Sequence, residues 1–227
     1  MSNPRTAIII GASRGIGLAL ARELAARGWR VMASERTRSD PLHELASASG
    51  GRVEVVTADV TDRASIAALP SGWTAATFDA VLVNAGIYDG RSVDEADDAD
   101  IAHIILANAA GPVRAARALL PLLREGATLA FTTSLMGSVA DSSGGAELYR
   151  MSKAAQNILA RGLFATEAKA RGIAVLSLHP GWVQTDMGGG NAPVSVDDSA
   201  RGLADVLGAP QPLAHRFLDF RGRELPW

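Results

Sequence analysis

The chain alternates between short apolar runs and longer stretches in which apolar residues recur with helical spacing. The short runs are rich in Ile, Val and Ala and are apolar on both faces, as in strands inside a parallel sheet. They predict strands at residues 6–10, 29–34, 53–58, 78–83, 128–132, 173–178 and 217–220. The longer stretches predict helices at residues 18–27, 97–124, 149–171 and 197–207.

Strands that alternate with helices predict a parallel sheet that is covered by helices on both faces. We therefore expect an α/β protein with a doubly wound parallel β-sheet of about seven strands, flanked by helices. No internal repeat, low-complexity tract or linker interrupts the pattern. Residues 1–227 are thus expected to form a single domain.

Composition narrows the classes of protein that fit. The chain has 227 residues, 48% of them hydrophobic, which is enough for one sizeable core. A net charge of −2 without a long basic run argues against nucleic-acid and membrane partners, and no apolar run has the length of a signal or membrane segment. With no Cys and no metal-ligand spacing among the four His residues, no metal site is expected. We expect a cytoplasmic protein.

A glycine-rich turn, Gly11-Ala12-Ser13-Arg14-Gly15-Ile16-Gly17, follows the first predicted strand and leads into the first predicted helix. Glycines at 11, 15 and 17 permit a tight turn and let backbone N–H groups approach a pyrophosphate at the positive end of the helix dipole. The strand–turn–helix–strand unit, complete by about residue 35, is typical of a Rossmann-type dinucleotide site. An ATPase-type phosphate loop is disfavoured because no Gly-Lys-Ser/Thr follows.

Polar and small residues gather where predicted strands end, at the edge of an α/β sheet where ligands bind. These residues are Glu35-Arg36, Asp59-Val60, Asn84-Ala85-Gly86, Ser134 and Pro180-Gly181. The turns at the opposite edge hold only ordinary helix breakers, Gly28, Gly126 and Gly172. This asymmetry favours a ligand site at the carboxyl ends of the strands.

Tyr149 and Lys153 lie four residues apart in a predicted helix, so their side chains share one face. A neighbouring ammonium favours the phenolate, so we expect Lys153 to lower the pKa of Tyr149. A tyrosine tuned in this way can exchange a proton with an alcohol or carbonyl oxygen. The alternative is a surface tyrosine and a solvated lysine that share a face by chance.

These motifs occur in an order that resembles the short-chain dehydrogenase/reductase family. The resemblance covers residues 6–187 and is of the compact type, because the glycines of the turn are spaced by three residues and then by one. Residues 179–189 and 222–227 resemble the carbonyl-reductase branch, which includes C-signal-like bacterial proteins.

The resemblance implies four catalytic residues. Tyr149 would be the general acid/base, Lys153 would lower its pKa and bind the nicotinamide ribose, and Ser134 would polarise the substrate oxygen. Asn108 would support a water and proton relay to Lys153, although a plain surface amide is the alternative. Ser134 and Tyr149 are fifteen residues apart, slightly more than is common in the family, so Ser138 is a second candidate for the serine.

The resemblance also implies that the cofactor is NAD(P)(H). The residues expected to bind it are Gly11, Ser13, Arg14, Gly15, Ile16, Gly17, Glu35, Arg36, Asp59, Val60, Asn84, Ala85, Gly86, Tyr149, Lys153, Pro180, Gly181, Val183 and Thr185.

The choice between NAD(H) and NADP(H) rests on conflicting residues. Glu35 follows the second predicted strand, where an acid would bond the adenosine ribose 2′-OH and repel a 2′-phosphate. Arg36 and Arg14 lie where related reductases place cations for that phosphate. The sequence leans slightly to NAD(H) through Glu35.

The expected function is an oxidoreductase that transfers a hydride between a nicotinamide cofactor and a small alcohol or carbonyl substrate. The alternative is a non-catalytic dinucleotide-binding sensor or signalling protein of the same fold. The full set of Asn108, Ser134, Tyr149 and Lys153 favours catalysis, because a protein that only binds has no need of the tyrosine. By family analogy, a homodimer or homotetramer is expected.

Overall fold

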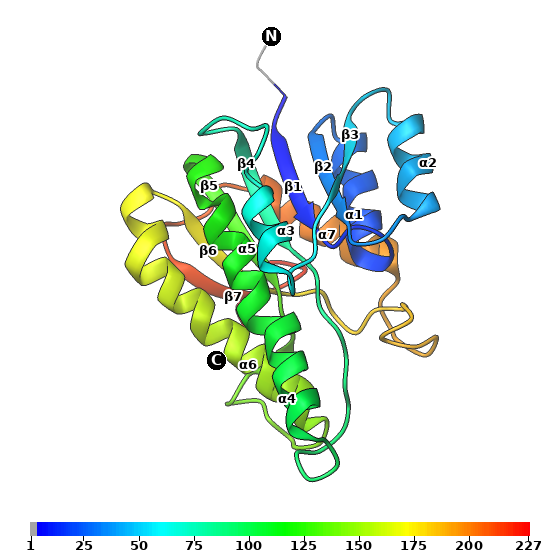
Figure 1. Cartoon of the computed structure of the whole chain (residues 1–227), viewed down its shortest axis with the longest axis vertical. Helices are drawn as coiled ribbons and strands as arrows, with labels where there is room; N and C mark the ends of the chain where they lie inside the picture. Colours follow the sequence, from blue (N-terminus) through cyan, green and yellow to red (C-terminus); the bar gives the residue numbers. More distant parts are fainter. Residues whose placement is uncertain (1–3) are drawn as a thin grey trace.

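The computed structural model describes residues 4–227 and contains one seven-stranded sheet (Figure 1). All its strand pairs are parallel, and the strand order is β3-β2-β1-β4-β5-β6-β7. The strands are β1 (Thr6–Ile10), β2 (Arg30–Glu35), β3 (Val53–Thr57), β4 (Phe78–Val83), β5 (Leu123–Thr132), β6 (Ala174–His179) and β7 (His215–Asp219). The predicted doubly wound α/β fold is confirmed, and the order reverses between β1 and β4, where such sheets bind ligands.

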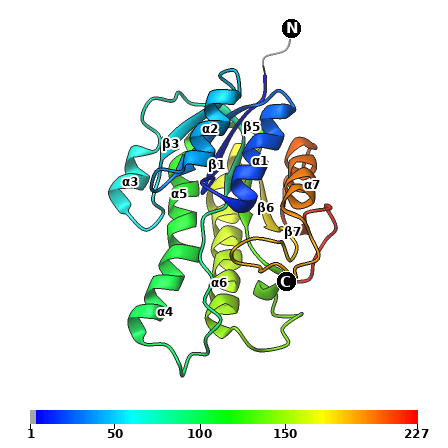
Figure 2. The ribbon, with the colours of Figure 1, turned by 90° about the vertical axis from the view of Figure 1, so that its right-hand side faces the viewer.

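Helices cover both faces of the sheet, as Figure 2 shows from the side. One face packs against α1 (Gly15–Ala26), α2 (Asp40–Ala48) and α7 (Val196–Gly208). The other packs against α3 (Arg63–Ala68), α5 (Gly111–Leu119) and α6 (Glu147–Leu163). Two apolar cores result, one on each side of the sheet, which is why strand β1 is buried along its whole length.

The long predicted helix at 97–124 is a composite of several helical types. It consists of α4 (Asp98–Ile105), the π-turn η1 (Leu106–Ala110), α5 and the 3₁₀ turn η2 (Leu120–Leu122). The prediction was wrong at its end, because β5 begins at Leu123, five residues before the predicted strand. Pro121 removes a backbone donor and tightens the last turn, and a shift in register after Phe78 takes up the extra strand residues.

Two short helices, α2 and α3, were not predicted. Each buries a single apolar residue, Leu42 in α2 and Ile66 in α3, so neither shows a clear apolar stripe in the sequence. Their starts do carry a signal, since the side chains of Ser39 and Asp62 accept N-cap hydrogen bonds from Leu42 N and Ala64 N.

The predicted helix at 149–171 is confirmed, but several polar side chains lie on the buried face of its first half. Helix α6 continues through the π-turn η4 (Phe164–Ala168) and the 3₁₀ turn η5 (Lys169–Arg171) to Gly172. Tyr149, Ser152, Lys153 and Gln156 are buried, whereas Ile158 and Leu159 are exposed. In Figure 1 the first half of α6 and helix α4 extend beyond the carboxyl edge of the sheet.

None of the helices within residues 4–227 is both long and apolar enough to cross a lipid bilayer.

Candidate active site

The glycine turn packs tightly against the neighbouring strand end. Gly11 and Gly15 have left-handed backbone angles (φ +90° and +54°) that favour glycine. A Cβ on Gly17 would lie 2.1 Å from the Gly11 carbonyl oxygen, and one on Gly11 would lie 2.7 Å from the Ala85 nitrogen. The turn thus brings the start of α1 against the end of β4 and leaves no room for larger side chains.

The N-terminus of α1 has features that suit an anionic ligand. Its first residue outside the helix, Arg14, makes no side-chain capping hydrogen bond, and the first turn contains no acidic residue. The first N–H groups of a helix need partners from outside it, and the helix dipole favours a negative charge there. This end of α1 therefore fits the diphosphate of a dinucleotide.

Asn84 ties three strands together at the carboxyl edge of the sheet. Its side-chain amide donates to the Gly11 carbonyl (2.8 Å) and accepts from the Thr132 hydroxyl (2.9 Å). The backbone nitrogens of Asn84 and Ala85 both donate to the Ile10 carbonyl (2.8 and 2.9 Å). Asn84 thereby holds the ends of β1, β4 and β5 in place around the glycine turn.

Of the two candidate serines, Ser134 meets Tyr149. Ser134 is buried just after β5, where its hydroxyl accepts from the Met136 nitrogen (3.1 Å) and lies near enough to the Tyr149 phenol to lower the pKa of that group. Ser138 is also buried, but its hydroxyl accepts from the Asp141 nitrogen (3.1 Å) within the following loop. The geometry therefore favours Ser134 as the partner of the tyrosine.

The pKa of Tyr149 shifts in the direction opposite to the one predicted. Burial raises the pKa of Tyr149 to about 12; the nearby Ser134 hydroxyl acts to lower this pKa, and Tyr88 acts to raise it. Burial also lowers the pKa of Lys153 to about 7. The Lys153 ammonium nitrogen lies 5.7 Å from the centre of the Tyr149 ring and donates to the Thr132 carbonyl (2.9 Å). Near neutral pH the tyrosine consequently holds its proton, which is the form that can donate one.

Asn108 is a buried amide and not a surface residue. It lies in the π-turn η1, where its side-chain oxygen accepts from the Ile87 nitrogen (2.7 Å). Its side-chain nitrogen donates to the Ile87 carbonyl (2.8 Å) and the Ser152 hydroxyl (2.9 Å). A Cβ on Gly86 would lie 3.1 Å from the Asn108 side-chain oxygen and 3.5 Å from the Lys153 ammonium nitrogen. Asn108 and Lys153 therefore approach the same glycine.

Three residues of this site were missed by the sequence reasoning. Ser152 links Asn108 to the Tyr149 carbonyl, Gln156 accepts from the Lys153 ammonium (3.3 Å), and Thr132 contacts both Asn84 and Lys153. Ser152 and Gln156 are spaced three residues from Tyr149 and Lys153 respectively, which places them on the same face of α6. This spacing is the feature of the sequence from which Ser152 and Gln156 could have been predicted.

The residues expected around the adenosine lie together beside the glycine turn. Glu35 is buried and Arg36 is exposed at the end of β2, while Arg14 is exposed in the turn itself and pairs with Asp186 (2.6 Å). Burial acts to raise the pKa of Asp59, but hydrogen bonds from Thr61 and the charge of Arg36 hold it below its usual value.

Residues 180–188 fold back toward the same turn. Gly181 has φ +90°, and a Cβ there would lie 3.1 Å from both the Phe220 and Val194 side chains. The Thr185 hydroxyl accepts from the Gly188 nitrogen (3.1 Å), and a Cβ on Gly15 would lie 3.5 Å from the Thr185 methyl group. Of the predicted residues here, Pro180 and Val183 are buried, and the Pro180 carbonyl accepts from the Ser199 hydroxyl (2.7 Å).

A cavity of about 680 Å³ lies away from these residues, between α7 and β7, and none of the predicted site residues lines it. In the part of the chain that the structure describes, no three His, Cys, Asp or Glu residues gather as metal ligands would.

The chain is similar in sequence and in structure to known proteins. The family model for short chain dehydrogenases matches residues 5–193. The C-signal protein of Myxococcus xanthus is 44% identical over 154 residues, covering 66% of this chain and 92% of that protein. Two solved structures overlie almost the whole chain. A short-chain dehydrogenase/reductase from Burkholderia multivorans with bound NADP has a TM-score of 0.92 at 37% identity, covering 99% of this chain and 100% of that one. A carbonyl reductase from Pseudomonas aeruginosa in complex with NADP has a TM-score of 0.90 at 39% identity, with the same coverage.

Proposed function

The chain belongs to the short-chain dehydrogenase family, and from that premise we propose that it is an NADP(H)-dependent carbonyl reductase in which Tyr149 is the proton donor. As a member of this family it is an oxidoreductase that uses a nicotinamide cofactor and a small alcohol or carbonyl substrate. The comparisons support this function and not the non-catalytic alternative.

The observation that carries the proposal is the buried Tyr149 side chain, with the buried Ser134 near enough to affect its pKa and the Lys153 ammonium nitrogen 5.7 Å from the centre of its ring. A protonated phenol and a serine hydroxyl that face the same space can both donate to one carbonyl oxygen. Ser134 would orient that oxygen, and Tyr149 would transfer its proton to it. Lys153, which titrates near neutrality because it is buried, would assist the loss of that proton.

The dinucleotide would be held by the glycine turn, the uncapped start of α1, and the residues expected from the sequence at the ends of β2, β3 and β4. When bound, the nicotinamide supplies the hydride-transfer chemistry, and the protein supplies orientation and proton transfer.

At the adenosine end, the preference for NAD(H) that the sequence predicts through Glu35 finds no support. Both carboxylate oxygens of Glu35 already have partners, the Ser39 nitrogen (2.6 Å) and the His43 ring (2.9 Å). Arg36, which follows Glu35, and Arg14 in the glycine turn, which pairs with Asp186, are both exposed, and guanidinium groups pair well with phosphate. The bound NADP of the Burkholderia and Pseudomonas proteins points the same way.

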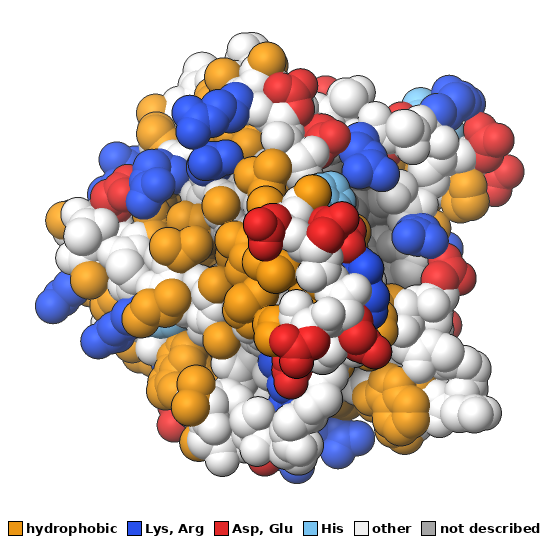
Figure 3. Space-filling model, turned by 60° about the horizontal axis from the view of Figure 1, so that its bottom comes forward, with side chains coloured by type: hydrophobic (Ala, Val, Ile, Leu, Met, Phe, Trp, Pro, Cys, Tyr) orange, Lys and Arg blue, Asp and Glu red, His pale blue; other side chains and the backbone are white. Residues whose placement is uncertain are grey.

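Homodimer or homotetramer formation and a cytoplasmic location stay predictions. Support for self-association comes from α6, where Ile158 (68% exposed) and Leu159 (41%) present apolar side chains to the outside. Figure 3 shows hydrophobic side chains gathered on one face of the molecule, bordered by acidic ones.

The test of the proposal is the reduction of a panel of aliphatic and aromatic carbonyl compounds by NADPH and NADH, followed at the absorbance of the reduced cofactor. Tyr149→Phe keeps the ring but removes the proton, so kcat should fall by about 10² to 10⁴-fold. Calorimetry should show that the variant still binds NADP+.

The matched control is Tyr88→Phe. Tyr88 is the only other tyrosine, and its ring contacts that of Tyr149 with 5.0 Å between centres. Its phenylalanine variant should turn over like the wild type. Equal turnover in Tyr149→Phe and wild type would refute the proposed proton donor, whereas cofactor binding without any turnover in the wild type would favour the sensor.

A further inference from the structure

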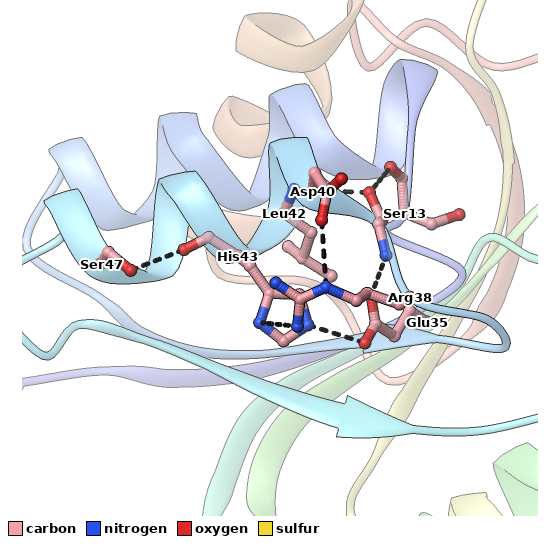
Figure 4. Close-up of polar contacts among 8 residues, drawn as sticks. Ser13, Glu35, Arg38, Asp40, Leu42, His43 and Ser47 are labelled. Atoms are coloured by element: carbon pink, nitrogen blue, oxygen red, sulfur yellow. Dashed lines mark hydrogen bonds and ion pairs between the residues drawn. The ribbon is translucent and has the colours of Figure 1, made fainter.

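The carboxylate of Glu35 is held by the beginning of helix α2 (Figure 4). One of its oxygens accepts from the Ser39 nitrogen (2.6 Å), and the other lies 2.9 Å from the His43 ring nitrogen Nε2. Ser39 also donates through its hydroxyl to the Ser13 carbonyl (2.6 Å), which joins α2 to the glycine turn. The end of β2, the start of α2 and the glycine turn are thus linked around one buried acid.

His43 is oriented from its other side as well. The Arg38 guanidinium lies 3.5 Å from Nδ1 of His43, and Arg38 in turn pairs with Asp40 (3.0 Å). Because Nδ1 faces the Arg38 donor, Nε2 is the ring nitrogen that donates its N–H to Glu35. His43 therefore acts as a fixed donor that directs the carboxylate toward α2.

Glu35 differs from its charged neighbours in burial. It is 7% exposed, whereas Arg14, Arg36 and Arg38 are exposed. Burial acts to raise the pKa of Glu35, but the hydrogen bonds from His43 and Ser39 and the nearby charges lower it overall, so the group is a carboxylate at neutral pH. The end of β2 thus retains the Glu35 carboxylate anion, whose oxygens face α2, while Arg36 and Arg38, which follow it along the chain, are exposed.

We propose that His43 is a specificity-determining residue: by holding the Glu35 carboxylate against α2, it lets the end of β2 accept the 2′-phosphate of NADP(H). The inference rests on the proposed function, since it concerns the adenosine end of the same cofactor. An acid at this place with free oxygens bonds the ribose 2′-OH and repels a phosphate. In this chain both oxygens of the acid have partners within the protein, and Arg36 and Arg38, which follow it along the chain, are exposed.

The proposal differs from a purely structural role of the same network. If His43 only anchored α2, its loss would weaken every dinucleotide by a similar factor. If it sets specificity, its loss frees one carboxylate oxygen, which weakens the binding of 2′-phosphorylated ligands and strengthens the binding of those with a 2′-OH. The ratio of the two affinities therefore separates the two roles.

The experiment measures the Kd of NADP+ and NAD+ by calorimetry, together with those of 2′,5′-ADP and 5′-AMP, which probe the adenosine end alone. The wild type should prefer NADP+ and 2′,5′-ADP. In His43→Ala the preference should fall by about tenfold, the equivalent of one charged hydrogen bond. His43→Gln keeps an N–H donor and should restore most of the preference.

Two further variants make the result specific. In a Glu35→Gln background, His43→Ala should leave the NADP+/NAD+ ratio unchanged, because no carboxylate remains to be released. Ser47→Ala is the matched control on α2, since the Ser47 hydroxyl donates to the His43 backbone carbonyl (2.9 Å) and not to its ring, and the substitution should not alter the ratio. Thermal unfolding checks that each variant is folded, and His43→Leu replaces His43→Ala if the alanine variant is not.

The outcomes separate this inference from the function on which it rests. A wild type that binds neither dinucleotide would overturn both. A wild type that binds them but prefers NAD+, or variants of His43 with an unchanged ratio, would overturn the inference and leave the dinucleotide-dependent reductase intact.

Discussion

The polar side chains of this site are buried and contact one another. Tyr149 meets Ser134, Lys153 meets Thr132 and Gln156, and Asn108 meets Ser152. In such surroundings a lost hydrogen-bond partner leaves a desolvated polar group behind, which costs more than a surface contact. Ser134 and Ser138 should therefore differ sharply in their contributions to kcat and to stability.

Ser134→Ala and Ser138→Ala form a matched pair for measuring that difference. Ser134→Ala removes the hydroxyl beside Tyr149, and kcat for carbonyl reduction should fall by about 10²-fold or more. Ser138→Ala removes a bond to the Asp141 nitrogen and should cost ~1 kcal/mol of stability with near-normal kcat. If the larger loss of kcat belonged to Ser138→Ala, the assignment of the serine would be reversed.

At the scale of elements, close backbone approaches position the site. The glycine turn allows α1 to start beside β4, and Gly137 allows the turn after Ser134 to rest on α6, since a Cβ there would lie 2.8 Å from the Lys153 carbonyl carbon. The π-turn η1 places Asn108 toward the Ile87 backbone. Each device depends on tight packing, and interiors packed in this way tolerate added atoms poorly.

Two alanine substitutions test this dependence. Gly17→Ala would place a Cβ 2.1 Å from the Gly11 carbonyl, so the turn must shift. We expect a loss of ~1–3 kcal/mol in urea unfolding and much weaker binding of NADP+. Gly162→Ala, in α6 with nothing within 4 Å of the new Cβ, should stabilise the protein by ~0.5–1 kcal/mol and leave binding unchanged. Normal cofactor affinity in Gly17→Ala would count against the proposed role of the turn.

For the whole molecule, the histidines of the last two strands, His179 half-buried and His215 buried, link stability to pH. Burial lowers the pKa of His179 and of His215 to about 4. Between pH 4 and about 6.5 each imidazole is neutral in the folded chain and protonated in the unfolded one. Unfolding then takes up protons, so the free energy of unfolding should fall as the pH drops through this window.

Urea unfolding at a series of pH values from 7 to 4 measures this effect. Each histidine should contribute up to about 1.4 kcal/mol per pH unit. His215→Phe keeps an aromatic ring against Trp227 (4.7 Å between ring centres in the wild type) and should reduce the slope by about half. The same slope in the variant and the wild type would show that His215 does not titrate as its burial implies.

Local sequence was sufficient for those features that depend on neighbours along the chain. Apolar runs indicated seven strands, although not where β5 begins. The glycines at 11, 15 and 17 marked the turn, and a spacing of four put Tyr149 and Lys153 on one face of a helix. These features follow from backbone geometry and hydrophobic periodicity, which a short window contains.

Contacts between distant segments settled the rest. Burial by surrounding strands and helices, and not the spacing to Lys153, sets the direction of the Tyr149 pKa. The hydroxyl of Ser134 meets Tyr149 because β5 ends beside α6, and Glu35 faces His43 because the unpredicted helix α2 begins there. Solvation and hydrogen-bond partners depend on what the fold brings close in space, so a pattern along the chain indicates which residues react but not how each one is tuned.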